Sequence, residues 1–203
     1  GPATDYLGDL ARRHHLAVIA GLAESGPEKQ VFATQVVITP GKPLGIYRKT
    51  HPGPPEKPIF TPGDTIPLFS FKGLKFGIQL CYDAHFPELT TAMALQGADA
   101  IFVPHASPRS TPDEKQASWL RHLPARAYDN SLFVIASNLC GENGRGLSFP
   151  GVALALNPAG EIMASLAGEK EQMVVVDLSA ADLQAVRSHA MRYFLPNRRP
   201  EIY

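Results

Sequence analysis

The stretch that most constrains the fold runs from Leu74 to Glu88. It begins with alternating apolar residues, which is typical of a buried β-strand, and then reaches Cys81. A short polar turn follows, and Pro87 stands near the start of a predicted helix. A thiol at a strand end and beside a helix N-terminus lies in a positive backbone field, which favours the nucleophilic thiolate. The stretch therefore predicts a strand–turn–helix unit with a candidate nucleophile at its turn.

Length and composition exclude several classes of protein. With 203 residues, 44% of them hydrophobic and 19% charged, the chain can form one soluble domain with a sizeable core. Nineteen basic and nineteen acidic residues give zero net charge, which argues against nucleic-acid or membrane partners. No apolar run approaches the roughly 18 residues of a membrane span, and no signal peptide is recognised. Two cysteines, Cys81 and Cys140, are too few for a disulfide framework or a zinc site, so a cytoplasmic protein without metal is expected.

Periodicity and turn residues divide the chain into strands and helices. Helices are predicted over residues 3–15, 90–96, 113–129 (kinked at Pro124) and 179–188. Strands are predicted over residues 16–22, 31–39, 44–48, 98–103, 132–137 and 173–178, with a hairpin formed by 152–157 and 161–166. Residues 50–65, with five prolines and two glycines, and the glycine-rich residues 141–151 are predicted loops. The pattern predicts a single domain over residues 1–203, a mixed sheet packed by helices.

Three residues suggest acyl-transfer chemistry. Lys49 ends a predicted strand, Glu56 lies in the proline-rich loop, and Cys81 ends the central strand. In such a set a thiolate attacks a carbonyl or nitrile carbon, a carboxylate carries the proton, and an ammonium stabilises the developing charge. Each residue also has a plainer interpretation, because strand cysteines are often core residues, and strand-end lysines and loop glutamates are usually solvated. Spacing alone does not decide between these interpretations.

Five segments of the chain point further when they are taken together and in order. A Tyr-Arg-Lys-x-His motif is followed by Phe-x-Pro-Gly-Asp and then by Cys-Tyr-Asp-x-x-Phe-Pro-Glu. In this order and separation the chain resembles the nitrilase superfamily of carbon–nitrogen hydrolases, in its amidase and N-carbamoyl amidohydrolase-like branch. The segments that carry the resemblance are Gly45–His51, Phe60–Asp64, Gly77–Glu88, Phe149–Glu161 and Asn197–Tyr203.

The resemblance implies both a fold and a reaction. The fold would be α/β, a four-layer α-β-β-α sandwich, and the reaction would be hydrolysis of a non-peptide C–N bond by a Glu-Lys-Cys triad without cofactor or metal. Cys81 would form a thioester acyl-enzyme, and Lys49 would stabilise the tetrahedral intermediate together with the backbone N–H of Tyr82. Glu56 matches an additional family glutamate that supports the lysine and the substrate.

The resemblance also implies a class of substrate and of partner. The substrate would be a small linear amide or N-carbamoyl compound that releases ammonia, and nitrile hydrolysis by the same cysteine is an alternative. Family members associate through C-terminal segments, so residues 187–203 are expected to be an interface in a homo-oligomer. A thiol redox protein is a weaker alternative, because the sequence contains no Cys-x-x-Cys motif.

The chain departs from the family pattern upstream of Lys49. The family's general-base glutamate lies at the end of an N-terminal strand, whereas the residues before Lys49 match the segment that follows that glutamate. The first strand, the first helix and the base are therefore expected to be missing from this sequence, and Glu24 matches a later strand end. Two interpretations stay open: an incomplete chain of an active enzyme, which is favoured, or a non-catalytic relative that binds a small molecule or a partner protein. Loss of a general base costs roughly 10²–10⁴-fold in rate.

Three residues near the elbow are candidates for substrate binding: Tyr82, His85 and His105. His85 occupies a variable position where some carboxylate-binding relatives carry arginine. A neutral imidazole is a weaker carboxylate clamp than a guanidinium, so a dicarboxylate-type substrate is disfavoured. His105 follows a predicted strand and is expected near the same mouth. For both histidines a purely structural position is the alternative, and Cys140, which no lysine or carboxylate motif accompanies, is interpreted as structural.

Overall fold

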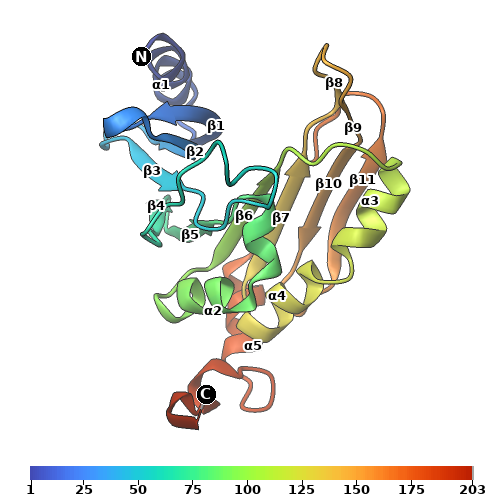
Figure 1. The fold of residues 1–203 in the computed structure, drawn as a ribbon. Coiled ribbons are helices and arrows are strands. Elements are labelled where there is room, and N and C mark those ends of the chain that lie inside the picture. Colours follow the sequence, from blue (N-terminus) through green and yellow to red (C-terminus); the bar gives the residue numbers. More distant parts are fainter. Residues whose placement is uncertain (203) are drawn as a thin grey trace.

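The computed structural model describes residues 1–202, which form two main β-sheets with helices on their outer faces (Figure 1). The smaller sheet is antiparallel, in the order β1-β2-β3. The register of β1 against β2 runs from Val18 opposite Ile38 to Ser25 opposite Val31, so the two strands form a long hairpin. The strands are β1 (Val18–Ser25), β2 (Val31–Ile38) and β3 (Gly45–Arg48), and a short 3-10 turn, η1 (Pro27–Lys29), joins the first two.

The larger sheet has the order β11-β10-β7-β6-β5-β4. Its central strands β5, β6 and β7 are parallel, whereas β4, β10 and β11 pair antiparallel with their neighbours. The carboxyl ends of the parallel strands therefore meet at one edge of the sheet. The strands are β4 (Phe69–Phe71), β5 (Leu74–Ile78), β6 (Ala100–His105), β7 (Phe133–Asn138), β10 (Gly151–Leu156) and β11 (Ile162–Gly168); β8 (Gly141–Glu142) and β9 (Ser148–Phe149) form a separate ribbon.

The helices cover the two outer faces of the sheets. In β2, Val36 and Ile38 pack against Ala11 of α1, while Val37 between them belongs to the main core, as the twofold alternation of a strand requires. On the far side α3 contacts β10 and β11, and α4 contacts β7. The layers are thus α-β-β-α, which confirms the predicted fold (Figure 1). The helices are α1 (Pro2–His14), α2 (Pro87–Leu95), α3 (Pro112–Trp119), α4 (Leu123–Asn130) and α5 (Ala180–Arg187), and the short 3-10 turns are η2 (Cys81–His85), η3 (Leu195–Asn197) and η4 (Pro200–Ile202).

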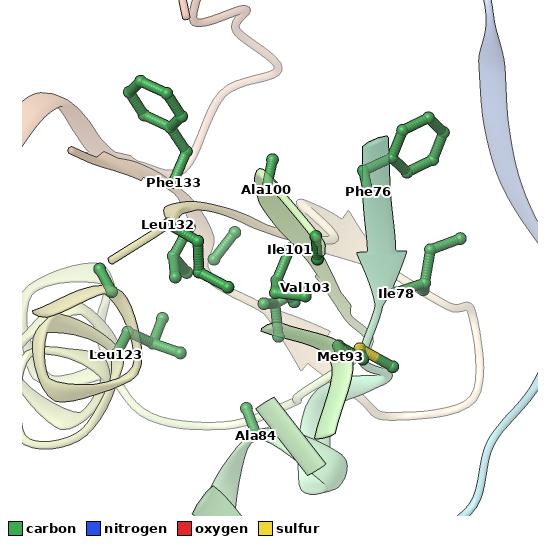
Figure 2. Packing of buried hydrophobic residues seen from close by; sticks show 14 of the residues in the cluster. Phe76, Ile78, Ala84, Met93, Ala100, Ile101, Val103, Leu123, Leu132 and Phe133 are labelled. Atoms are coloured by element: carbon green, nitrogen blue, oxygen red, sulfur yellow. The ribbon is translucent and has the colours of Figure 1, made fainter. Parts of the chain in front are cut away.

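The main core lies around the parallel strands (Figure 2). Ile78, Ile101 and Phe133 have no exposed surface. Burial of each such side chain stabilises the fold by about 1.5–3 kcal/mol. Gly77 lets α2 approach β5 closely, because a Cβ at this position would lie 2.5 Å from the Sδ atom of Met93. This packing holds the strand that leads to Cys81.

Several predicted elements differ from the structure. Residues 173–178 form no strand, and Met173 and Val175 are 84% and 77% exposed, because no neighbouring strand pairs with this apolar run. The predicted helix 113–129 is two helices, α3 and α4, because Pro124 lacks an N–H and stands at the start of a new helix instead of kinking a continuous one. The β8–β9 ribbon lies in the predicted glycine-rich loop, and β4 was not predicted.

Two further sequence expectations concern surfaces. None of the helices within residues 1–202 is both long and apolar enough to cross a membrane. In the C-terminal segment Met191 is 79% exposed and Ile202 is 62% exposed. Exposed apolar side chains of this kind are compatible with an interface, and the homo-oligomer stays a prediction.

Candidate active site

Cys81 lies at a sharp elbow after β5, which confirms the predicted strand–turn–helix unit. Its φ angle is 50°, in the left-handed region that residues other than glycine rarely adopt. The 3-10 turn η2 begins at Cys81, and α2 then begins at Pro87. A strained backbone of this kind persists only where the surroundings hold it, and it is commonly found at functional sites.

Asp83 is a buried residue of the turn that holds the elbow through hydrogen bonds. Its side chain has no exposed surface. Its carboxylate accepts hydrogen bonds from the Leu80 N–H at 2.8 Å, the Tyr47 hydroxyl at 2.7 Å and the His51 N–H at 2.8 Å. The last two donors flank Lys49, so the buried carboxylate joins the lysine segment to the cysteine turn. Sequence reasoning did not assign Asp83 a role; an acidic residue within an otherwise buried stretch was the available signal.

Lys49 and Glu56 form a direct pair. The Lys49 side chain is 5% exposed, and its Nζ donates to Glu56 Oε2 at 2.6 Å. The Gly53 N–H donates to the same oxygen at 2.6 Å, and a Cβ on Gly53 would lie 3.1 Å from that oxygen. The irregular proline-rich loop, which the sequence predicted, thus wraps Glu56 back onto the lysine. Glu56 remains 35% exposed, whereas the Lys49 ammonium is largely removed from solvent and therefore acts strongly on neighbouring charges.

Electrostatics at Cys81 combine burial with the effects of nearby charges. Burial raises the pKa of the Cys81 thiol above its usual range, and the nearby Lys49 ammonium opposes that effect without cancelling it. Glu56 raises the pKa further, and Lys115 lowers it. The net result is a raised pKa of the thiol, because removal from water outweighs the positive charges of Lys49 and Lys115. The effect of the backbone field on the thiolate stays a prediction. A base must accept the thiol proton for the sulfur to attack.

The remaining predicted site residues surround the elbow. His85 is exposed, and its ring centroid lies 4.5 Å from that of His122 and 5.6 Å from that of Tyr82. The Tyr82 ring is 5.5 Å from that of Phe86, and both side chains line a cavity of about 450 Å³ together with the proline-rich loop. The substrate-binding roles of His85 and Tyr82 stay predictions.

His105 is placed at the end of β6, as predicted, but it is largely buried at 8% exposure. Its Nδ1 donates to the Val103 carbonyl at 2.8 Å, and its ring centroid lies 4.3 Å from that of Trp119 on α3. Burial lowers the pKa of His105 to about 3, so the ring is neutral at neutral pH. These contacts fasten β6 to α3, and a direct contact of His105 with substrate stays a prediction.

Other reactive side chains lie outside this group. The Cys140 thiol donates to the Glu169 carbonyl at 3.0 Å, and both cysteines are free thiols. Within residues 1–202 there is no group of three or more His, Cys, Asp and Glu side chains placed to hold a metal ion. The charges of Lys49 and Glu56 both act on the Cys81 thiol, so these three residues form the candidate catalytic group.

Comparisons with known proteins agree with the fold and the motifs. The family model for carbon–nitrogen hydrolases matches residues 1–188. The chain is 32% identical to an N-carbamoylputrescine amidase of Solanum lycopersicum over 219 aligned residues, which cover 100% of this chain and 72% of the relative.

Two solved structures are similar along the whole chain. A carbon–nitrogen hydrolase from Helicobacter pylori G27 superimposes with a TM-score of 0.90 and 27% identity, covering 100% of this chain and 74% of that one. A mutant amidase from Nesterenkonia sp. AN1, with a TM-score of 0.80 and 31% identity, covers 99% of this chain and 71% of that one. That structure shows covalent addition of the acetamide moiety of fluoroacetamide at the active site cysteine. This chain belongs to the carbon–nitrogen hydrolase family and is an enzyme of the class that hydrolyses C–N bonds.

Proposed function

We propose that this enzyme hydrolyses a small linear amide or N-carbamoyl compound through a thioester on Cys81 and releases ammonia. The Cys81 sulfur adds to the carbonyl carbon, and the C–N bond breaks as the nitrogen leaves with the thiol proton as ammonia. Water then attacks the thioester, which frees the acid product and restores the thiol. Substrates of this kind agree with the names of the similar amidases.

The observation that carries the proposal is the buried Lys49 ammonium beside the Cys81 elbow. Among the charged groups that lower the pKa of the Cys81 thiol, Lys49 has the largest effect. In this proposal the same ammonium, together with the Tyr82 backbone N–H, stabilises the oxyanion that forms when sulfur adds to a carbonyl. Preorganised charges of this kind are among the largest contributions to catalysis.

Glu56 acts as the partner that positions Lys49. Its Oε2 accepts hydrogen bonds from both the Lys49 Nζ and the Gly53 N–H, so the ionised form of Glu56 satisfies both donors. The general base would be a separate glutamate, which the resemblance implies upstream of the Lys49 motif. In this division of tasks Glu56 stays bound to Lys49, and another carboxylate moves the proton.

Ammonia release tests the reaction. A panel of linear amides, ureido acids and nitriles is incubated with the wild-type chain, with Cys81→Ala and with the matched control Cys140→Ala. We expect release from amides or carbamoyl compounds by wild type and Cys140→Ala, and none by Cys81→Ala. Release that survives unchanged in Cys81→Ala contradicts the mechanism, and release from nitriles alone supports the nitrile alternative.

Covalent labelling tests the nucleophile separately from turnover. Fluoroacetamide alkylates a thiol when the C–S bond forms, the C–F bond breaks and fluoride and the thiol proton leave. Intact-mass analysis should show one acetamide group added to wild type and to Cys140→Ala, but not to Cys81→Ala. Labelling at Cys81 without ammonia release from any substrate favours the non-catalytic binding protein over the hydrolase.

A homo-oligomer built on residues 187–203 is a further part of the proposal. The exposed Met191 and Ile202 side chains support it. Sedimentation of the chain and of a Met191→Glu variant is the test. A monomeric wild-type chain contradicts the interface.

A further inference from the structure

We propose that Lys115 binds a carboxylate at the distal end of the substrate, so that the enzyme acts on amides or ureido compounds that carry an acid group opposite the scissile bond. The inference deepens the proposed function and rests on it. It concerns a lysine for which sequence analysis predicted no role. Three observations support it: the position of Lys115, the lack of an ion pair between Lys115 and any carboxylate of residues 1–202, and the neutral groups around it.

Lys115 is held over the edge of the sheet that carries Cys81. Ser107 follows β6, and Asn138 ends β7, next to it in the sheet. The Ser107 N–H donates to Asn138 Oδ1 at 2.9 Å, and Asn138 Nδ2 donates to the Ser107 carbonyl at 3.0 Å. These two bonds fasten the segment after β6 to the carboxyl edge of the parallel strands. Lys115 of α3 then donates from Nζ to Ser107 Oγ at 2.8 Å, which fixes the ammonium above this edge.

The charge of Lys115 is not balanced by an acid. Lys49 and Lys115 are the two lysines whose charges act on the Cys81 thiol. Lys49 has Glu56 at 2.6 Å, whereas Lys115 forms no ion pair with any carboxylate of residues 1–202. A partly buried ammonium bound to a neutral hydroxyl retains most of its attraction for an anion. A carboxylate on the substrate would supply a counter-charge that no carboxylate of residues 1–202 provides.

Three histidines around the elbow, His85, His105 and His122, do not compete for this role. Partial removal from water lowers the pKa of His85, although its side chain is exposed, and burial brings that of His105 to about 3 and that of His122 to about 4. The neutral imidazole is therefore the favoured form of all three at neutral pH. Arg126 donates from Nε to the Ala84 carbonyl at 2.9 Å and is thereby held against the backbone of the elbow. Arg126 also forms no ion pair within residues 1–202, but it is not among the charges that act on the Cys81 thiol. Of the two lysines that do act on it, only Lys115 has no carboxylate partner within these residues. The sequence argument against acidic substrates considered His85 alone and did not include this lysine.

The chemistry separates two otherwise similar substrates. N-carbamoylputrescine and 4-ureidobutanoate share a terminal carbamoyl group and a short methylene chain. The first ends in an ammonium and the second in a carboxylate. An ammonium at the distal end would be repelled by Lys115, so we expect the acid to be the better substrate even though similar enzymes act on N-carbamoylputrescine.

Alkylation of Cys81 provides a test that needs no turnover. In a Cys140→Ala background, the rate constants for iodoacetate and iodoacetamide are measured; in both reactions the C–S bond forms, the C–I bond breaks and iodide leaves. The same Cys81 thiolate attacks both reagents, so the ratio of the two rate constants cancels any change in the pKa of Cys81. We expect the iodoacetate-to-iodoacetamide ratio to exceed that of N-acetylcysteine, to fall about tenfold in Lys115→Met and to be retained in Lys115→Arg.

Lys72→Met is the matched control for this measurement. Lys72 lies at the turn between β4 and β5, at the opposite end of the strand that leads to Cys81. The ratio in Lys72→Met should equal that of the parent chain. A ratio that is the same in Lys115→Met as in the parent overturns the proposal, and so does an equal fall in Lys72→Met.

Turnover provides the second test. The ratio of kcat/KM for 4-ureidobutanoate to that for N-carbamoylputrescine should favour the acid in wild type, fall about tenfold in Lys115→Met and invert in Lys115→Glu. An equal loss with both substrates in the Lys115 variants overturns the inference while the proposed function stands. If no substrate releases ammonia, the proposed function fails, and the alkylation ratio still decides the role of Lys115.

Discussion

Arg48 and Lys49 are neighbouring cations where β3 ends, yet they occupy opposite environments. Arg48 is 37% exposed and pairs with Glu24 of β1 through bonds of 2.5 and 3.0 Å. Its guanidinium also lies 4.2 Å from the centroid of the Phe32 ring. Lys49 is 5% exposed and pairs with Glu56. The two acids are both partly exposed, at 21% for Glu24 and 35% for Glu56, so the contrast lies in the cations: one reaches solvent and the other is buried.

The difference shows how adjacent positions at the end of a strand can place one cation toward solvent and the next one in the interior. Successive side chains of a strand point to opposite faces, so a shift of one residue moves a cation from the surface to the interior. A guanidinium forms a two-pronged pair and stays ionised in solvent, whereas a buried ammonium acts strongly on its few neighbours. Glu24, which the sequence analysis did not take as the base, is occupied by Arg48 and by the Thr34 hydroxyl at 2.7 Å.

The largest difference between the two pairs is expected in activity. Lys49→Met should lower kcat/KM for ammonia release by roughly 10²–10³-fold, because it removes a preorganised charge at the oxyanion. Arg48→Met should leave kcat/KM within about threefold, since an exposed pair contributes little. The pH midpoint of Cys81 alkylation should also rise in Lys49→Met, because the ammonium lowers the pKa of the thiol. Equal losses of activity in the two variants would contradict the comparison.

Removal of the acidic partners should give a smaller difference. Glu56→Gln should lower kcat/KM by roughly 10- to 100-fold, because Lys49 loses a charge-assisted hydrogen bond that fixes its position. The pH midpoint of Cys81 alkylation should fall in this variant, since Glu56 raises the pKa of the thiol. Glu24→Gln is the matched control and should leave both quantities unchanged. A rise of the midpoint in Glu56→Gln would show that lost placement of Lys49 outweighs the lost negative charge.

Variants of Asp83 test whether the elbow is stabilised by this carboxylate as well as by the Lys49–Glu56 pair. Asp83→Asn leaves a neutral oxygen for the donors of Leu80, Tyr47 and His51 and buries an NH₂ group among them, so the free energy of unfolding should fall by about 2–3 kcal/mol. Urea titration measures this change. Tyr47→Phe removes one donor and should cost less, about 1 kcal/mol. A larger loss in Tyr47→Phe would place the main stabilisation elsewhere.

The pH dependence of stability extends the comparison to a buried histidine. The pKa of His105 falls from 6.5 to about 3 on folding, so the unfolded chain binds more protons between these values. Stability is therefore complete above pH 6.5 and falls as the pH drops toward 3, by at most about 1.4 kcal/mol per pH unit for this proton. His105→Asn, which retains an N–H for the Val103 carbonyl, should reduce that slope in urea titrations. An unchanged slope in the variant would assign the loss to other groups.

The smallest effect is expected at the exposed pair. A double-mutant cycle with Arg48→Met and Glu24→Gln should give a coupling of about 0–1 kcal/mol in the free energy of unfolding, because solvent screens both side chains. The coupling should decrease in high salt. A coupling above about 2 kcal/mol would mean that the pair contributes as much as a buried one.

The local pattern of apolar and polar residues predicted most of the helices and strands, because buried positions recur every second residue in a strand and every three to four residues in a helix. The runs around β2, β6 and β7 were recognised from their apolar content, α1 from its helical spacing and α5 from the residues that begin it. Residues 173–178 misled the prediction because β-branched residues favour a strand only where a neighbour pairs with them. A proline can either kink a continuous helix or stand in the first turn of a new one, and the sequence does not distinguish the two. In the structure Pro124 stands in the first turn of α4.

The sequence by itself determined which groups are available for chemistry and in what order. The motifs around Lys49, Glu56 and Cys81 were sufficient to indicate the family and the candidate nucleophile. Only the tertiary structure decided how these groups act on one another. Burial at the elbow raises the pKa of the Cys81 thiol, and a hydroxyl two residues beyond β6 holds Lys115 near it. Charge interactions depend on distance and on exclusion of water, and neither quantity is encoded in the spacing of residues along the chain.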